Sequence, residues 1–318
     1  MEIPYETVNR FSFRSFLKDT GSAVGDLFLP RTCVVCGRPL LRHERYICLP
    51  CDAGLPLTAF QTVSHNVMAD RFNALIERRL AGSATKTVMP GTATAGVMPG
   101  AVASAAEAVM PGLTGHPHEP YARAAALFYY NSQASYRKIP QALKYHGAIG
   151  AGRHFARRLG RLLAASALYQ DVTMIVPVPL HWTRRRQRGY NQAEVIAREV
   201  AAALGVPMDA RLLRRRRRTR TQTRLSVEQK AANVGGAFTV RSRRLARWIP
   251  PYAPVSAPTV GLVAPSSGFV TPMHILLIDD VFTTGATLEA CHAALRAAGL
   301  GPDRCRISIA TLGYVGRL

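Results

Sequence analysis

A long uninterrupted apolar run is missing from this 318-residue sequence. No stretch approaches the roughly 18 consecutive apolar residues that a membrane-spanning helix needs, so we expect no membrane span. The N-terminal segment mixes Glu2 and Glu6 with Arg10 and Arg14, and it lacks the apolar core that a secretory signal requires. Both absences favour a cytoplasmic location.

Acidic residues are also scarce. The chain has 19 Asp and Glu against 41 Lys and Arg, which gives a formal net charge of +22. We expect a positive surface that attracts polyanions, although charge alone does not distinguish phosphates, nucleic acid and anionic lipid headgroups. The length predicts about two domains with a buried core.

Cysteine is concentrated in one place. Of six cysteines, four fall within a 19-residue segment, as Cys33, Cys36, Cys48 and Cys51. They form two C-x2-C pairs separated by 11 residues, and four thiolates in this pattern can converge tetrahedrally on one Zn²⁺. We predict structural zinc, because a closed four-cysteine set leaves no coordination position for catalysis. Redox or disulfide use is the alternative, which a reducing cytoplasm disfavours.

Two stretches have compositions that do not suit a packed core. Residues 81–118 consist largely of Ala, Gly, Thr, Val, Met and Pro, and we predict a disordered low-complexity insertion. Residues 242–272 contain a proline-rich insertion that cannot form a regular helix or a central strand. We therefore divide the rest into a lead-in helix over 1–30, a four-cysteine module over 31–80 and a main domain over 119–318.

Within the main domain, strand-like and helix-like segments alternate. Aliphatic runs predict strands at 171–179, 274–279 and 306–312, and apolar residues at helical spacing predict helices such as 191–205, which ends at a glycine. This alternation predicts an α/β fold with a parallel sheet flanked by helices. Ligands of such sheets bind at the carboxyl ends of the strands.

The carboxyl end of the predicted strand at 274–279 has an unusual composition. Asp279 and Asp280 follow four aliphatic residues, and the run from Val281 to Thr287 then turns toward the next predicted helix. Backbone N–H groups, threonine hydroxyls and the helix dipole of this turn suit a phosphate. Carboxylates repel phosphate but accept hydrogen bonds from vicinal hydroxyls. A ribose 5-phosphate has both groups, so these residues predict a sugar-phosphate site.

The segment from Ile275 to Thr287 resembles the phosphoribosyl pyrophosphate (PRPP) motif of type I phosphoribosyltransferases. Three further segments, 143–147 (LKYHG), 176–193 (VPVPLHWTRRRQRGYNQA) and 219–238 (TRTQTRLSVEQKAANVGGAF), together with the cysteine pairs, are similar to the ComF family. That family is associated with natural competence and DNA uptake. The resemblance implies a type I phosphoribosyltransferase-like sheet behind a small zinc-ribbon-like module.

By this resemblance, the chain binds PRPP with Mg²⁺. The implied PRPP contacts are Asp279, Asp280, Val281, Thr283, Thr284, Gly285, Ala286, Thr287, Pro179 and Arg188. A flexible loop that closes over the substrate is implied to contain Gln222, Arg224, Lys230 and Asn233. Asp279 and Asp280 are the catalytic candidates for displacement of pyrophosphate from ribose C1 by a nitrogen nucleophile.

A second hypothesis gives the same fold a binding role without catalysis. The run Arg214, Arg215, Arg216, Arg217 and Arg218 has the charge to contact a single-stranded DNA backbone. A competence accessory protein of this kind would also have proteins of the competence machinery as partners. A solvated, flexible loop is the alternative interpretation of the arginine run.

Overall fold

The computed structural model describes residues 31–84, 119–130, 135–145, 149–216, 236–248 and 272–316. The predicted lead-in helix over 1–30 lies outside these residues. So do nearly all of the low-complexity insertion and most of the proline-rich insertion. No helix in the described ranges is both long and apolar enough to cross a bilayer.

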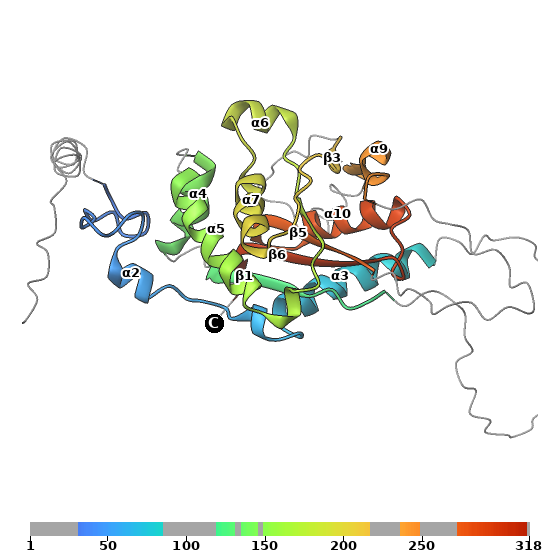
Figure 1. Ribbon diagram of the computed structural model, residues 1–318, viewed down its shortest axis with the longest axis horizontal. Helices are drawn as coiled ribbons and strands as arrows, with labels where there is room; N and C mark the ends of the chain where they lie inside the picture. The colour runs from blue at the N-terminus through green and yellow to red at the C-terminus, as the bar shows by residue number, and fades with distance from the viewer. Residues whose placement is uncertain are drawn as a thin grey trace, which may run out of the picture.

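A four-stranded sheet forms the centre of the molecule (Figure 1). Its strands are β1 (Ala124–Tyr130), β2 (Met174–Pro177), β5 (Met273–Phe282) and β6 (Cys305–Val315). They lie in the order β1-β6-β5-β2, and every neighbouring pair is parallel. The predicted α/β fold with a parallel sheet is therefore confirmed.

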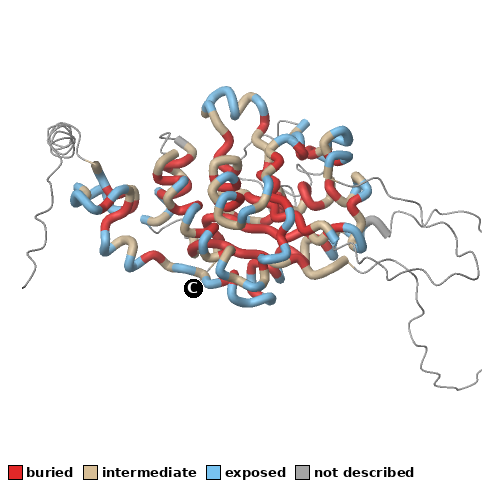
Figure 2. The backbone as a smooth tube through the Cα atoms, in the orientation of Figure 1, coloured by how far each residue is buried: buried red, intermediate tan, exposed pale blue. Residues whose placement is uncertain are grey.

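The sheet is buried on both faces (Figure 2). Along β5, Ile275 and Leu277 pack into one hydrophobic cluster, whereas Leu276 and Ile278 pack into a second cluster on the opposite face. Successive residues of a strand point to opposite faces, so a strand covered on both sides needs an uninterrupted aliphatic run. This requirement explains why the run was recognisable in the sequence.

Helices cover the two faces. The first face packs against α3 (Val67–Ala84) and α10 (Ala286–Ala297), and the second against α5 (Ile149–Ala164) and α7 (Gln192–Leu204). Helix α4 (Lys138–Tyr145) packs on α5. The other elements are α2 (Leu49–Ala53), α6 (Trp182–Arg188), α9 (Ser242–Leu245), an antiparallel pair β3 (Leu213–Arg215) and β4 (Phe238–Val240), and 3-10 turns at Phe60–Thr62, Ser135–Arg137 and Ala167–Tyr169.

Helix α7 begins and ends as its sequence predicts. The Asn191 side chain accepts a hydrogen bond from the N–H of Ala193, and this N-cap satisfies a first-turn donor. At the other end, Gly205 adopts φ 68° and donates its N–H to the Ala201 carbonyl. Both caps are local, so the sequence alone could locate them.

Helix α3 was not predicted. Met68, Phe72 and Ile76 on this helix are at most 1% exposed and belong to the cluster on the first sheet face. Most of its residues fall within the range 31–80 that the sequence assigned to the cysteine module, and its last turn, 81–84, falls in the range 81–118 that the sequence assigned to a disordered insertion. The boundary of that module stays a prediction, and α3 packs with the sheet.

Candidate metal centre and ligand site

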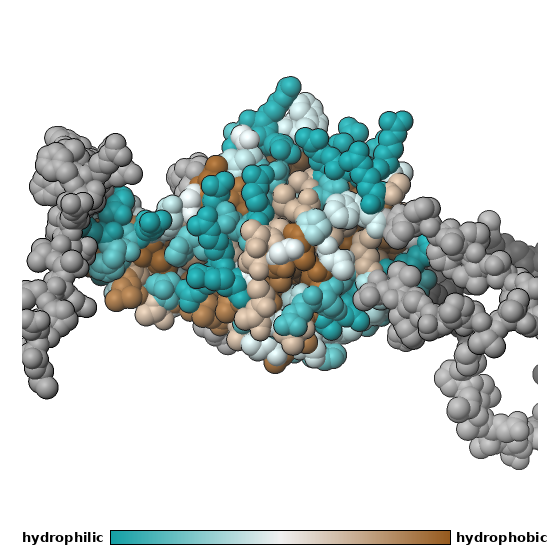
Figure 3. Space-filling view, viewed as in Figure 1, coloured by the Kyte–Doolittle hydropathy of each residue, from teal (hydrophilic) through white to brown (hydrophobic). Residues whose placement is uncertain are grey.

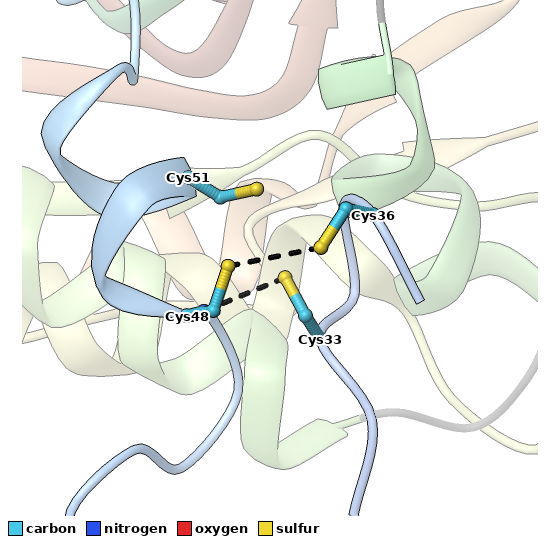
Figure 4. Close-up of side chains that lie close together, drawn as sticks. All are labelled: Cys33, Cys36, Cys48 and Cys51. Atoms are coloured by element: carbon cyan, nitrogen blue, oxygen red, sulfur yellow. Dashed lines mark hydrogen bonds between the residues drawn. The ribbon is translucent and has the colours of Figure 1, made fainter. Parts of the chain in front are cut away.

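Four cysteines meet at the N-terminal end of the described chain (Figure 4). The Sγ atoms of Cys33, Cys36, Cys48 and Cys51 all lie within 4.8 Å of one another, and those of Cys36 and Cys48 are 3.7 Å apart. Tetrahedral coordination at a Zn–S distance of about 2.3 Å puts neighbouring sulfurs about 3.8 Å apart. All four are free thiols. The four cysteines are therefore positioned to bind a metal ion.

Backbone hydrogen bonds favour the thiolate form of Cys33, which is the form that binds a metal ion. The N–H groups of Val35 and Cys48 each donate to the Cys33 Sγ at 3.4 Å. Burial opposes ionisation, but these backbone hydrogen bonds prevail and lower the pKa of Cys33 to about 6. Burial and the neighbouring cysteines raise the pKa of Cys51. Without a cation, the four groups therefore do not all ionise readily.

A buried carboxylate orders the loop between the two cysteine pairs. Glu44 is 6% exposed and accepts hydrogen bonds from the N–H groups of Leu41 and Leu49, at 2.9 and 2.6 Å. These hydrogen bonds lower the pKa of Glu44. The loop that separates the two C-x2-C pairs is thus fixed by an acidic residue that the sequence analysis did not single out.

Asp279 and Asp280 lie near the carboxyl end of β5, and their carboxylates have different surroundings. Asp280 forms an ion pair with Lys144 of α4, with 2.6 Å between Oδ2 and Nζ. Asp279 lines a hollow that residues 281–288 complete. Adjacent residues of a strand diverge in this way. The two acids are neighbours in sequence, but only Asp279 lines the hollow.

The hollow beside Asp279 lies at the N-terminus of α10. It is lined by Val281, Phe282, Thr283, Thr284, Gly285, Ala286, Thr287 and Leu288 as well as Asp279. The first N–H groups of any α-helix lack intrahelical acceptors, so they are available to an anion. Every loop residue predicted to contact PRPP from Val281 to Thr287 therefore lies around one small hollow.

Gly285 shapes this loop. Its φ is +79°, which L side chains rarely adopt. A Cβ there would also lie 2.6 Å from the Phe282 ring and 2.8 Å from Leu75 of α3. Arg71 of α3 anchors the same turn, because it donates to the Thr283 carbonyl at 3.1 Å and to the Val315 carbonyl at 3.0 Å. Helix α3 thus holds the loop in place through Arg71 and Leu75.

Burial and neighbouring charges shift the pKa values of Asp279 and of Lys144. Desolvation and the Asp280 carboxylate raise the pKa of Asp279 to about 7, although Lys144 and Arg215 oppose this shift. Burial disfavours a charged Lys144, but the attraction of Asp280 prevails and raises its pKa. Asp279 therefore changes its charge near neutral pH, while Lys144 stays protonated.

The other residues implied in PRPP binding come from the segment after β2. The N–H of Val178 donates to the Ile278 carbonyl at 2.8 Å, so Pro179 starts beside the acid pair. Arg188, the last residue of α6, donates to the Gln192 side chain at 3.1 Å, and its charge acts on Lys144. The structure thus brings both segments to the same edge of the sheet.

Part of the predicted site falls outside the described residues. Gln222, Arg224, Lys230 and Asn233 of the flexible loop are among these, as are Arg217 and Arg218 of the arginine run. Arg214 and Arg216 are exposed, whereas Arg215 is half-buried with its guanidinium 5.2 Å from the centre of the Phe238 ring. Burial and the charge of Arg184 lower the pKa of Arg215, and the charge of Asp279 opposes this shift.

The sequence did not reveal three contacts: Lys144 with Asp280, Arg71 with the Thr283 carbonyl, and Arg215 with the Phe238 ring. Lys144 belongs to the LKYHG segment, but its partner Asp280 is 136 positions away in the sequence. Arg71 lay on the helix that was not predicted, although apolar residues at 68, 72 and 76 have helical spacing and could have indicated it. All three contacts join distant parts of the chain, so local patterns did not reveal them.

Comparison with known proteins gives partial matches. The chain is 29% identical over 126 residues to Competence protein F of Haemophilus influenzae, which covers 40% of this chain and 45% of that protein. It is 32% identical over 124 residues to the DNA utilization protein YhgH of Salmonella typhi and of Salmonella typhimurium, over 38% of this chain and 43% of each relative. The chain thus matches less than half the length of these relatives. No family model matches it. Over the matched part, these similarities to a competence protein and to DNA utilization proteins confirm the resemblance to the ComF family that the sequence motifs predicted.

Proposed function

We propose that this chain binds PRPP with Mg²⁺ at the carboxyl edge of its sheet and transfers the phosphoribosyl group to a nitrogen nucleophile. The observation that supports this best is the single hollow shared by Asp279, three threonines and the N-terminus of α10. Phosphate suits the threonine and N–H side of the hollow, and ribose hydroxyls suit the carboxylate. A ligand that carries both groups would match both sides of the hollow.

Asp279 and Asp280 have separate tasks in this proposal. Asp279 accepts the ribose hydroxyls, because it lines the hollow. Asp280 holds Lys144, so it places a cation beside the site. Lys144, Arg188 and Arg215 then provide positive charge toward the departing pyrophosphate. Such fixed charges lower the barrier only if they interact more strongly as the leaving group gains charge.

The proposed reaction breaks the bond between ribose C1 and the pyrophosphate oxygen. The electron pair leaves with pyrophosphate, the nitrogen nucleophile forms the new bond to C1, and its proton passes to solvent. The carboxylate of Asp279 is suited to orient the ring and to favour positive charge on it. In its protonated form, Asp279 would do neither well.

Mg²⁺ would arrive with its substrate. Within the described residues, the only group of three or more potential ligand side chains close enough for one metal ion is the cysteine cluster. The acid pair has two carboxylates, and Asp280 is engaged with Lys144. The proposal therefore assigns most of the oxygen ligands to PRPP, and Mg²⁺ would supply charge neutralisation at the pyrophosphate.

For the cysteine cluster we propose structural Zn²⁺. Four thiolates without an oxygen or open position favour zinc in a structural role. Arg31 and Arg38 belong to the same module: Arg31 donates to the Glu44 carbonyl at 3.2 Å, and Arg38 pairs with the Glu44 carboxylate at 3.8 Å. Their charge offsets part of the negative charge of a four-thiolate centre.

We further propose a link to DNA uptake in a cytoplasmic setting. Support comes from the relatives, which are named as a competence protein and DNA utilization proteins. The alternative is a non-catalytic, single-stranded-DNA-binding accessory of the competence machinery. One observation favours it: the Trp182 side chain is 60% exposed, and an exposed aromatic ring suits stacked bases.

Calorimetric titration with PRPP and Mg²⁺ tests the main proposal. The wild type should bind, and Asp279→Asn should weaken binding at least about tenfold, since a charged hydrogen-bond acceptor is lost. Glu77→Gln, an exposed acid on α3, is the matched control and should bind like the wild type. Absence of PRPP binding to the wild type would refute the proposal. Salt-sensitive DNA binding that survives Asp279→Asn would support the accessory role.

A further inference from the structure

A second hollow lies between α5, α6 and α7. Its cavity volume is about 170 Å³, and it shares no lining residue with the hollow beside Asp279. Three arginines from three helices line it: Arg153 of α5, Arg185 of α6 and Arg198 of α7. Hydrophilic side chains are prominent over α5 and α6 in the space-filling view (Figure 3). The convergence of three guanidinium groups on one hollow suits an anion.

The ion pairs around this hollow leave it positive. Glu194 is the one carboxylate in its lining, and it pairs with Arg185 and Arg198 at 3.4 Å each. Arg153 pairs with Glu199, also at 3.4 Å, outside the lining. These arginine side chains are 47 to 60% exposed. Exposed pairs contribute only about 0–1 kcal/mol, so a phosphate that binds guanidinium groups bidentately can compete for them.

The remaining lining residues of the hollow are apolar, or their polar atoms already form hydrogen bonds within the protein. Ile149, Val195 and the Tyr190 ring line the hollow, and the Tyr190 hydroxyl donates to the Leu143 carbonyl, which holds the ring in place. The Asn191 amide donates to the Val178 carbonyl at 3.0 Å and accepts from the Ala193 N–H at 3.2 Å. A flat ring can therefore pack here, but Asn191 is not available to distinguish one base from another.

We infer that this hollow binds a free mononucleotide, with its phosphate against Arg153, Arg185 and Arg198 and its base against Tyr190 and the aliphatic wall. Because the walls recognise a phosphate and a flat ring, purine and pyrimidine nucleotides bind with similar affinity. The site is independent of the proposed function, since it uses neither the acid pair nor the loop from Thr283 to Thr287.

Helix α6 provides a matched control for this inference. Arg185 lines the hollow, and Arg186, the next residue, stacks on Trp182 instead. Both side chains are exposed and carry the same charge. A general electrostatic effect would therefore respond equally to the loss of either arginine, whereas a site in the hollow depends on Arg185.

The experiment is calorimetric titration with dAMP at about 50 mM salt, where screening is modest. We expect one site, at least about tenfold weaker binding of deoxyadenosine, and dTMP within about threefold of dAMP. Arg185→Gln and Arg198→Gln should each weaken dAMP binding about five- to tenfold, and Arg186→Gln should stay within about twofold. Equal effects of Arg185→Gln and Arg186→Gln, or no binding of dAMP, would overturn the inference.

Two further arms locate the nucleotide. Saturating PRPP with Mg²⁺ should leave dAMP binding unchanged, because the hollows are separate. If PRPP displaces dAMP and Arg185→Gln has no effect on dAMP binding, dAMP binds in the PRPP loop and the inference is refuted. Binding of a ten-residue oligothymidylate through Arg185 without binding of dTMP would indicate a strand-binding surface and refute it too. If PRPP does not bind but dAMP binding depends on Arg185, the proposed function fails and this inference stands.

Discussion

The cysteine module and the sheet domain are stabilised in different ways. Around the cysteines, the buried apolar side chains are few, chiefly Val35, Ile47 and Leu55, and they join the cluster on the second sheet face, while Glu44 fixes the loop. The sheet instead has an extensive hydrophobic cluster on each face. A segment with so small a core depends on a metal ion, whereas the sheet domain is stabilised by apolar burial. Because the module adds few side chains to a cluster that the sheet and its helices largely form, we predict that loss of the metal unfolds the module and leaves the sheet domain folded.

The largest expected effect is on the module. Cys48→Ser removes one ligand and should release the metal, with loss of up to about 10 kcal/mol of binding-coupled folding free energy. Metal content by mass spectrometry and limited proteolysis of the module should both change, while the sheet domain keeps its cooperative unfolding transition. Arg42→Ser, at an exposed position of the same loop, is the control. Undiminished metal content in Cys48→Ser would contradict the assignment.

The reverse experiment damages only the sheet domain. Glu119 pairs with Arg296 and His292, and these contacts outweigh desolvation and lower the Glu119 pKa to about 2. Glu119→Gln leaves Arg296, 10% exposed, without its carboxylate and should cost about 3 kcal/mol in urea unfolding, with metal content unchanged.

The pH dependence of this pair has a defined sign. Because the folded-state pKa of Glu119 is depressed, its stabilisation is present above the ordinary glutamate pKa of 4.5 and declines as pH falls toward about 2. The variant should lack that decline. An equal acid sensitivity of wild type and Glu119→Gln would show that the pair does not stabilise the fold.

Two glycines sharpen the comparison within the sheet domain. Gly285→Ala combines positive φ with contacts to Phe282 and Leu75, whereas Gly205→Ala has positive φ and open space. We expect losses of about 2–3 kcal/mol and about 1 kcal/mol respectively in urea unfolding. Equal losses would mean that α3 does not support the loop as described.

The smallest expected effect is a gain in stability. The pKa of Asp279 is raised from 3.8 to about 7, so the group favours folding below pH 3.8 and this contribution is lost as pH rises through about 7. Asp279→Asn should therefore raise Tm by about 2–4 °C at pH 8 and change it little at pH 4, measured by calorimetry. PRPP affinity of the wild type should rise between pH 6 and 8. A lower Tm of the variant at pH 8 would contradict this origin of the pKa shift.

The features that the sequence predicted are local. The aliphatic run before Asp279 identifies a strand because both faces are covered, and the spacing of Cys33, Cys36, Cys48 and Cys51 suffices to predict the cluster. Contacts across the fold could not be predicted. Lys144 reaches Asp280 from another helix, and the opposite directions of the two carboxylates follow only once both are placed in β5.

The proposed site requires Asp279 to accept a ribose hydroxyl while the adjoining loop holds a phosphate. The most direct measurement compares the affinities of ribose 5-phosphate and 2-deoxyribose 5-phosphate for wild type and Asp279→Asn. We predict that the wild type prefers ribose 5-phosphate by about tenfold and that the variant binds both sugars equally, as this role of Asp279 requires. Equal affinity of the wild type for the two sugars, or a preference that persists in Asp279→Asn, would contradict it.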